Sequence, residues 1–86
     1  MTICCLIEKY IYLNNRGTSY YYREDYQTAI KYFQKVIDLV EGYDDMSFEL
    51  NLGRLNLGDC YLQLNMVDLA VKYINECQLF FVGNGG

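Results

Sequence analysis

The chain has 86 residues, of which 52% are apolar, and a formal net charge of −4 without any histidine or proline. One domain of this length buries only about 60 to 65% of the surface that its unfolded form exposes, and the apolar content argues against disorder. The acidic balance disfavours binding to nucleic acid or an anionic membrane, because neutralising phosphates requires clustered Lys and Arg. We therefore expect a soluble, all-helical domain without either kind of partner.

The first predicted helix runs from about residue 3 to residue 22. Its opening apolar stretch, 2–7, is too short to span a bilayer and is followed at once by charged residues, so we expect no export signal. Apolar residues at three- and four-residue spacing predict an inward face. That face comprises Leu6, Ile7, Tyr10, Leu13, Gly17 and Tyr20.

The second predicted helix follows Asp25, whose carboxylate is placed to cap it, and it ends at Gly42, which can adopt a left-handed conformation. Its apolar residues recur on one face and its polar residues on the other, as in an amphipathic helix. The apolar face comprises Ala29, Ile30, Phe33, Val36, Ile37 and Val40.

The third predicted helix begins after Asp44 or Asp45 as N-cap and runs to about residue 64, where Asn65 can take a left-handed conformation. Apolar residues lie along two of its sides, so it should be central. A fourth helix follows from Val67, with a flexible Gly-rich tail at 83–86. The short connections pack sequential helices side by side, which predicts two stacked antiparallel helical hairpins.

The four cysteines are Cys4, Cys5, Cys60 and Cys77, and their spacing does not suggest disulfides. Without histidine they are the only candidate zinc ligands, and two of them are adjacent, so we interpret all four as buried small apolar residues. We expect no metal and no cofactor. Reduced cysteines favour the cytoplasm, with the nucleus as the alternative.

An internal repeat with a period of 41 residues is the most informative feature of the sequence. In both copies a glycine precedes a tyrosine by three residues, the tyrosine precedes an alanine by nine, and a large apolar residue follows four later. Small residues let two helices approach closely and large ones fill the space. The repeat-packing residues are Gly17, Tyr20, Ala29 and Phe33, then Gly58, Tyr61, Ala70 and Ile74.

These residues resemble the tetratricopeptide repeat, whose pattern places Leu-Gly-x-x-Tyr before Ala-x-x-x-Phe and a closing proline. The second copy matches closely; the first has Arg16 in place of the leucine, and neither has the proline. The resemblance covers a domain at 1–82, with repeat one at about 10–43 and repeat two at about 51–82.

The period is seven residues longer than the common 34, or about two helical turns. We expect one extra turn at the end of the second helix and one at the start of the third. The chain thus resembles the longer-repeat members, which include the repeats of kinesin light chains, rapsyn and Pins-type adaptors. That resemblance implies a protein-binding scaffold or adaptor.

The resemblance further implies that the first helix of each pair lines a concave groove for a peptide or helix. The expected groove residues are Ile11, Asn14, Thr18, Tyr21, Tyr22, Leu52, Leu55, Asp59, Leu62 and Gln63. In the carboxylate-binding subgroup this surface carries Lys and Asn, whereas here Asp59 would repel a peptide carboxylate. We therefore expect an apolar or amphipathic helical ligand. Packing and ligand contact remain equal alternatives for Tyr21 and Tyr22.

Catalysis is not expected, because the chain lacks histidine and a Gly-rich phosphate loop. We interpret the acidic pairs at 24–25 and 44–45 as helix caps, because carboxylates at a helix start are stabilised by its dipole.

Two repeats are fewer than the three usually needed to bury their own surfaces. The apolar run at 79–82 should add to the surface that is left uncovered. The alternative function is therefore structural assembly, by homo-oligomerisation, by docking to further repeats or as part of a longer array.

Overall fold

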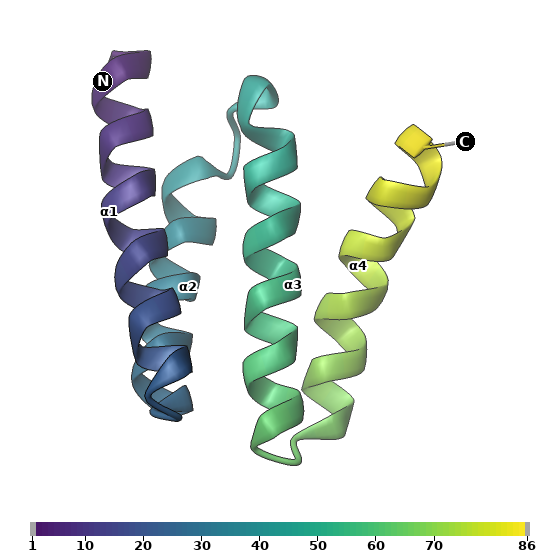
Figure 1. The fold of residues 1–86 in the computed structure, drawn as a ribbon. Helices are drawn as coiled ribbons and strands as arrows, with labels where there is room; N and C mark the ends of the chain where they lie inside the picture. Colours follow the sequence, from purple (N-terminus) through teal and green to yellow (C-terminus); the bar gives the residue numbers. More distant parts are fainter. Residues whose placement is uncertain (1, 86) are drawn as a thin grey trace.

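A computed structural model describes residues 2–85, and side-chain exposure within 2–81. It contains four α-helices and one 3-10 turn: α1 (Ile3–Tyr22), α2 (Tyr26–Val40), η1 (Asp44–Met46), α3 (Ser47–Gln63) and α4 (Val67–Gly85). Figure 1 shows the helices alternating in direction as two antiparallel hairpins, α1 with α2 and α3 with α4. The predicted all-α fold is confirmed, and the described residues include no strand.

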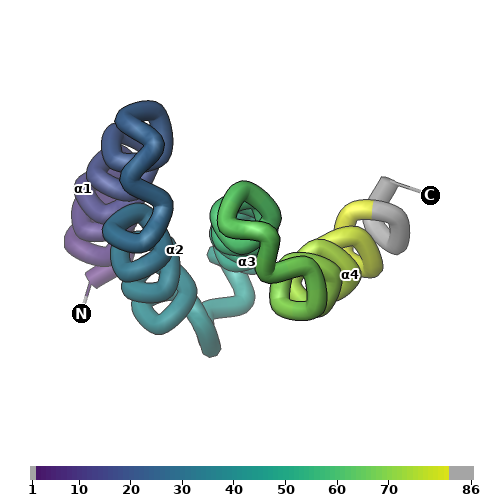
Figure 2. The backbone as a smooth tube through the Cα atoms, turned by 90° about the horizontal axis from the view of Figure 1, so that it is seen from below, coloured from purple at the N-terminus to yellow at the C-terminus, as the bar shows by residue number. Residues whose placement is uncertain are grey.

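The helices lie side by side in chain order. Helix α1 packs on α2, α2 on α3, and α3 on α4, so that α3 is flanked on both sides (Figure 2). The molecule measures 37 × 31 × 17 Å and is therefore a flat layer, as expected for a solenoid whose units contact only their neighbours.

Within each hairpin, a glycine on the first helix lies in close contact with a large side chain on the second. A Cβ atom added at Gly17 would lie 2.8 Å from Phe33 Cε1, and one added at Gly58 would lie 2.8 Å from Ile74 Cγ1. Any side chain at these two positions would push the helices apart. Both glycines are buried, as are Ala29 and Ala70, so the small residues stand where the helices of each hairpin approach most closely.

Each hairpin also carries a stacked tyrosine pair that the sequence analysis did not identify. Tyr20 stacks on Tyr32 with ring centroids 5.6 Å apart, and Tyr61 stacks on Tyr73 with centroids 5.8 Å apart. The residues of both pairs are 12 positions apart in the sequence. All four rings are partly exposed, so each pair lies at the border between the hairpin's core and solvent.

The core consists of two clusters of buried residues. One contains Ala29, Phe33, Ile37, Leu57 and Cys60, and the other contains Leu6, Val40 and Met46. Cys60 and Cys77 are buried as expected, but Cys4 and Cys5 are exposed, contrary to prediction. Ile7 is likewise 41% exposed rather than inward, because no helix covers that side of the first turns of α1.

Three helix ends follow the signals that the sequence predicted. Asp25 accepts a hydrogen bond of 3.3 Å from the Thr28 amide, and both Gly42 (φ 91°) and Asn65 (φ 61°) adopt the left-handed conformation. Glu24 does so too (φ 63°), which the sequence analysis missed because residues other than glycine, asparagine, aspartate and histidine rarely adopt it.

Helix α2 ends at Val40, two residues before the left-handed Gly42 that was expected to end it, and residues 44–46 form η1 ahead of α3. Two other predicted boundaries were wrong. Neither Asp44 nor Asp45 caps α3, since its N-cap is Met46, which makes no side-chain capping bond. Helix α4 continues to Gly85, three residues beyond the expected end, so the tail predicted at 83–86 is helical as far as residue 85. Residue 86 lies outside the described residues.

Candidate protein-binding groove between α1 and α3

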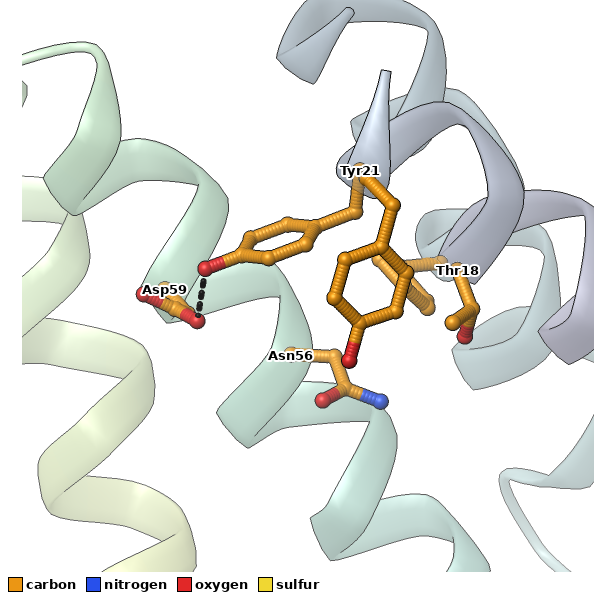
Figure 3. A pocket seen from close by; sticks show the side chains of 6 residues that line it. Thr18, Tyr21, Asn56 and Asp59 are labelled. Carbon is orange, nitrogen blue, oxygen red and sulfur yellow. Dashed lines mark hydrogen bonds between the residues drawn. The ribbon is translucent and has the colours of Figure 1, made fainter. Parts of the chain in front are cut away.

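Tyr21 and Asp59 connect the first helices of the two hairpins. The Tyr21 hydroxyl donates a hydrogen bond of 2.7 Å to Asp59 Oδ2, as Figure 3 shows. Beside this bond is a hollow of about 130 Å³, which we call the Tyr21 hollow. It is lined by Thr18, Tyr21, Tyr22, Phe33, Asn56 and Asp59.

The Tyr21 hollow has a negative, hydrogen-bonding character. Asp59 also accepts a hydrogen bond of 3.4 Å from the Gln63 amide nitrogen. The Asp59 hydrogen bond, with partial burial, raises the pKa of Tyr21 to about 12. Burial and the Asp59 carboxylate raise the pKa of Cys60 to about 12. Tyr21 is therefore a neutral hydrogen-bond donor at ordinary pH.

Four of the predicted groove residues line this hollow: Thr18, Tyr21, Tyr22 and Asp59. Gln63 joins them through its bond to Asp59. Sequence reasoning missed Asn56 and assigned Phe33 to packing alone. Asn56 could have been found, because it lies one helical turn before Asp59 and so shares its face.

Tyr21 and Tyr22 have different surroundings. The Tyr21 ring packs edge-on against Tyr26, at 5.4 Å between centroids, and is half-buried. Tyr22 is 78% exposed. The sequence left packing and ligand contact as equal alternatives for both residues. Their surroundings differ, because Tyr21 packs against a neighbouring ring whereas Tyr22 is available for contact with a ligand.

Ile11 lines a second hollow, of about 370 Å³, together with Ile3, Ile7, Tyr10, Asp45, Met46 and Glu49. We call it the η1 hollow, because Asp45 and Met46 belong to η1. Burial, with a smaller effect of the Glu49 charge, raises the pKa of Tyr10. Figure 1 shows that η1 lies at the end of the molecule where α1 begins.

The two hollows lie on the same faces of α1 and α3. Ile11 and Thr18 are two turns apart on α1, and Glu49 and Asn56 are two turns apart on α3, so each pair shares a helix face. Asn14 lies between them, and its Oδ1 is buried without a hydrogen-bond partner among the described residues. We call this face the α1–α3 groove.

The predicted leucines lie outside both hollows. Leu52 is half-buried, whereas Leu55 and Leu62 are 38% and 48% exposed. They stand on α3, and Leu55 and Leu62 are one heptad apart, so both present the same apolar strip to solvent.

The described residues were compared with the features of a metal site and of a membrane-spanning helix. Within them, no group of three or more His, Cys, Asp or Glu side chains is close enough to hold a metal ion. None of the helices there is both long and apolar enough to cross a membrane.

The two structural hairpins coincide with matches to a known repeat. Family models of the tetratricopeptide repeat match residues 10–43 and residues 53–79. The chain belongs to the tetratricopeptide repeat family. Such repeats imply a protein–protein interaction module, and the family is generally non-catalytic.

This tetratricopeptide repeat chain is similar to "Anaphase-promoting complex subunit CDC16" from Saccharomyces cerevisiae (strain ATCC 204508 / S288c). The two are 33% identical over 60 residues, which is 70% of this chain and 7% of the relative. The chain thus spans only a small part of that protein's length. No solved structure matches it.

Proposed function

We propose that this repeat pair binds a peptide or helix of another protein in the α1–α3 groove, without catalysis. One observation carries the proposal: the Tyr21–Asp59 bond joins the two hairpins beside a hollow that four predicted groove residues line. Because the bond fixes Tyr21, the exposed Tyr22 and the amide of Asn56 can meet a ligand with little further ordering. Tyrosine is well suited to such contacts, since it loses few torsional degrees of freedom.

The charge of the Tyr21 hollow selects against one ligand class. Asp59 is the charged residue lining the hollow, so a C-terminal carboxylate placed there would meet a like charge. We propose instead a ligand that donates hydrogen bonds to Asp59 and Asn56 and lays an apolar side chain on Tyr22. A cytoplasmic or nuclear location stays a prediction.

A second candidate function is assembly through α4. Val67, Val71 and Leu79 of this helix are 53%, 49% and 77% exposed, and the similar protein is by name a subunit of a complex. A further repeat, or a second copy of the chain, would cover these side chains. Phe80 and Phe81 are partly buried, and the side chain of Val82 lies outside the described residues.

The two functions are separated by one pair of variants. Tyr21→Ala with Asp59→Lys should abolish capture of a protein ligand from a cell lysate by the immobilised chain, with the oligomeric state unchanged. The matched control is Tyr43→Ala with Asp38→Lys, which changes exposed residues outside the groove. Capture that survives the groove change, or a sedimentation coefficient altered by it, would contradict the groove proposal and favour assembly.

A further inference from the structure

The η1 hollow is built mainly by residues that the repeat motif does not explain. Ile3 and Ile7 precede the first family match at 10–43, and Asp45, Met46 and Glu49 lie between that match and the second at 53–79. The insertion that lengthens the period therefore supplies one wall of the hollow. The first two turns of α1 supply the other.

The wall on α1 is an exposed apolar ridge. Ile3, Ile7 and Ile11 are 49%, 41% and 49% exposed and follow one another at four-residue spacing. At 1.5 Å per residue the ridge is roughly 12 Å long, or about two helical turns. Between the walls Met46 is buried and forms part of the floor. A second helix laid along this ridge would cover all three isoleucines.

The opposite wall is acidic. Asp45 and Glu49 line the hollow, and its seven lining residues include no Lys or Arg. Within the described residues, neither carboxylate forms an ion pair or accepts a side-chain hydrogen bond. An apolar ridge facing unpaired carboxylates is complementary to a helix that has both an apolar stripe and cations.

We propose that the η1 hollow binds a basic amphipathic helix of a partner protein, with its apolar stripe on Ile3, Ile7 and Ile11 and its Lys or Arg side chains facing Asp45 and Glu49. The proposal rests on the proposed function, because the η1 hollow lies on the same faces of α1 and α3 as the Tyr21 hollow, and it names the chemistry of the ligand at that end. The Tyr21 hollow would receive the continuation of the same segment.

The test uses a defined probe. A 15-residue acetylated and amidated peptide carries leucines at i, i+4, i+7 and i+11 with lysines beside them, and a control peptide has glutamate in place of each lysine. Binding is followed by fluorescence anisotropy and by the methyl NMR signals of the full chain. We expect the lysine peptide to shift the methyl signals of Ile3, Ile7, Ile11 and Met46, and to bind at least about ten-fold more tightly than the glutamate peptide.

Charge reversal locates the contact. Asp45→Lys with Glu49→Lys should lower the affinity of the chain for the lysine peptide about ten-fold. Asp38→Lys with Glu41→Lys should leave its affinity within about two-fold, although both pairs raise the formal charge from −4 to 0. If the first pair fails to fold, Asp45→Asn with Glu49→Gln, which keeps the side-chain shapes, should still reduce affinity and its salt dependence.

The inference would be overturned if about 1 mM peptide caused no methyl shifts or if both peptides bound equally. Concentration-dependent shifts of the same methyl groups without peptide would overturn it as well, because a second copy of the chain would then fill the hollow. Shifts confined to the Tyr21 hollow would also overturn it, yet leave the proposed function standing. The opposite outcome is also possible. If the lysine peptide shifts the isoleucine methyl signals, but Tyr21→Ala with Asp59→Lys leaves capture from the lysate unchanged, the inference about the η1 hollow is supported and the proposed function is contradicted.

Discussion

The hydroxyl of Tyr21 lies 2.7 Å from Asp59 Oδ2, and this hydrogen bond joins residues that are 38 positions apart. Other side-chain pairs, such as Gln34 with Asp38, connect residues of one helix four positions apart. The Tyr21–Asp59 bond is therefore a direct link between α1 and α3, the two helices that border the groove.

We predict that this bond stabilises the fold. Tyr21→Phe and Asp59→Asn should each lower the free energy of unfolding by about 1 kcal/mol, because the first removes a hydrogen bond to a partly buried carboxylate and the second weakens it by removing the acceptor's charge. In a double-mutant cycle measured by urea denaturation, the two changes should be non-additive. Tyr22→Phe is the control and should be neutral. Additive effects would mean that the bond contributes nothing.

The bond also predicts a pH dependence. The Tyr21 pKa is raised to about 12 in the folded chain, above the unfolded value near 10. The folded state therefore favours the protonated phenol, so this contribution to stability is fully present below about pH 10 and is lost as the pH rises through about 12. In ¹³C NMR of labelled tyrosines, Asp59→Asn should return Tyr21 toward its ordinary pKa. A Tyr21 signal that titrates near 10 in the parent chain would contradict the prediction.

Glycine substitutions should distinguish close contact from helix propensity. Alanine at position 58 would place Cβ 2.8 Å from Ile74 Cγ1 and 3.3 Å from the Ala70 carbonyl oxygen. We expect Gly58→Ala to lower stability by about 1 kcal/mol, since overpacking exceeds the gain in helix propensity. By thermal denaturation this corresponds to a fall in Tm of about 4 to 8 °C.

Gly53→Ala is the matched control within the same helix. Its nearest contact would be Ile37 Cγ1 at 3.3 Å, followed by Val36 Cγ1 at 3.4 Å, so packing and propensity should nearly cancel. If Gly58→Ala left Tm as little changed as Gly53→Ala, the close approach of α3 and α4 at Gly58 would not be needed for the fold.

Thiol reactivity should divide the cysteines into two pairs. Cys4 and Cys5 are exposed, whereas Cys60 and Cys77 are buried, and burial raises the pKa of both buried thiols, that of Cys60 to about 12. Only the thiolate reacts. At pH 8, two thiols should react quickly with Ellman's reagent and all four should react in denaturant. Rapid reaction of a third thiol in the native chain would show that one of the buried positions opens.

Much of the fold was predictable because it depends on local and periodic signals. The amphipathic face of α2, the Asp25 cap and the left-handed Asn65 each follow from a few neighbouring residues. The 41-residue repeat then fixed which helices pair, because two copies of Gly, Tyr and Ala at equal spacing require equal packing.

The insertion between the repeats was not predictable in detail. The sequence predicted one extra helical turn at the end of α2 and one at the start of α3, whereas residues 44–46 form the separate 3-10 turn η1 and α3 begins at Ser47. Short polar stretches satisfy several backbone conformations equally, so contacts with the rest of the chain decide among them. Here the side chain of Met46, packed with Leu6 and Val40, holds η1 in place.

The sequence by itself determined the repeat, the helices and the face of α1 and α3 on which a groove could lie, since these depend on residue spacing along one chain. Only the tertiary structure decided that Tyr21 reaches Asp59, that Asn56 joins them, and that Ile3, Ile7 and Ile11 face Asp45 and Glu49. Contacts between helices depend on their separation and relative rotation. Those are set by the summed packing of the whole core, and no local pattern records them.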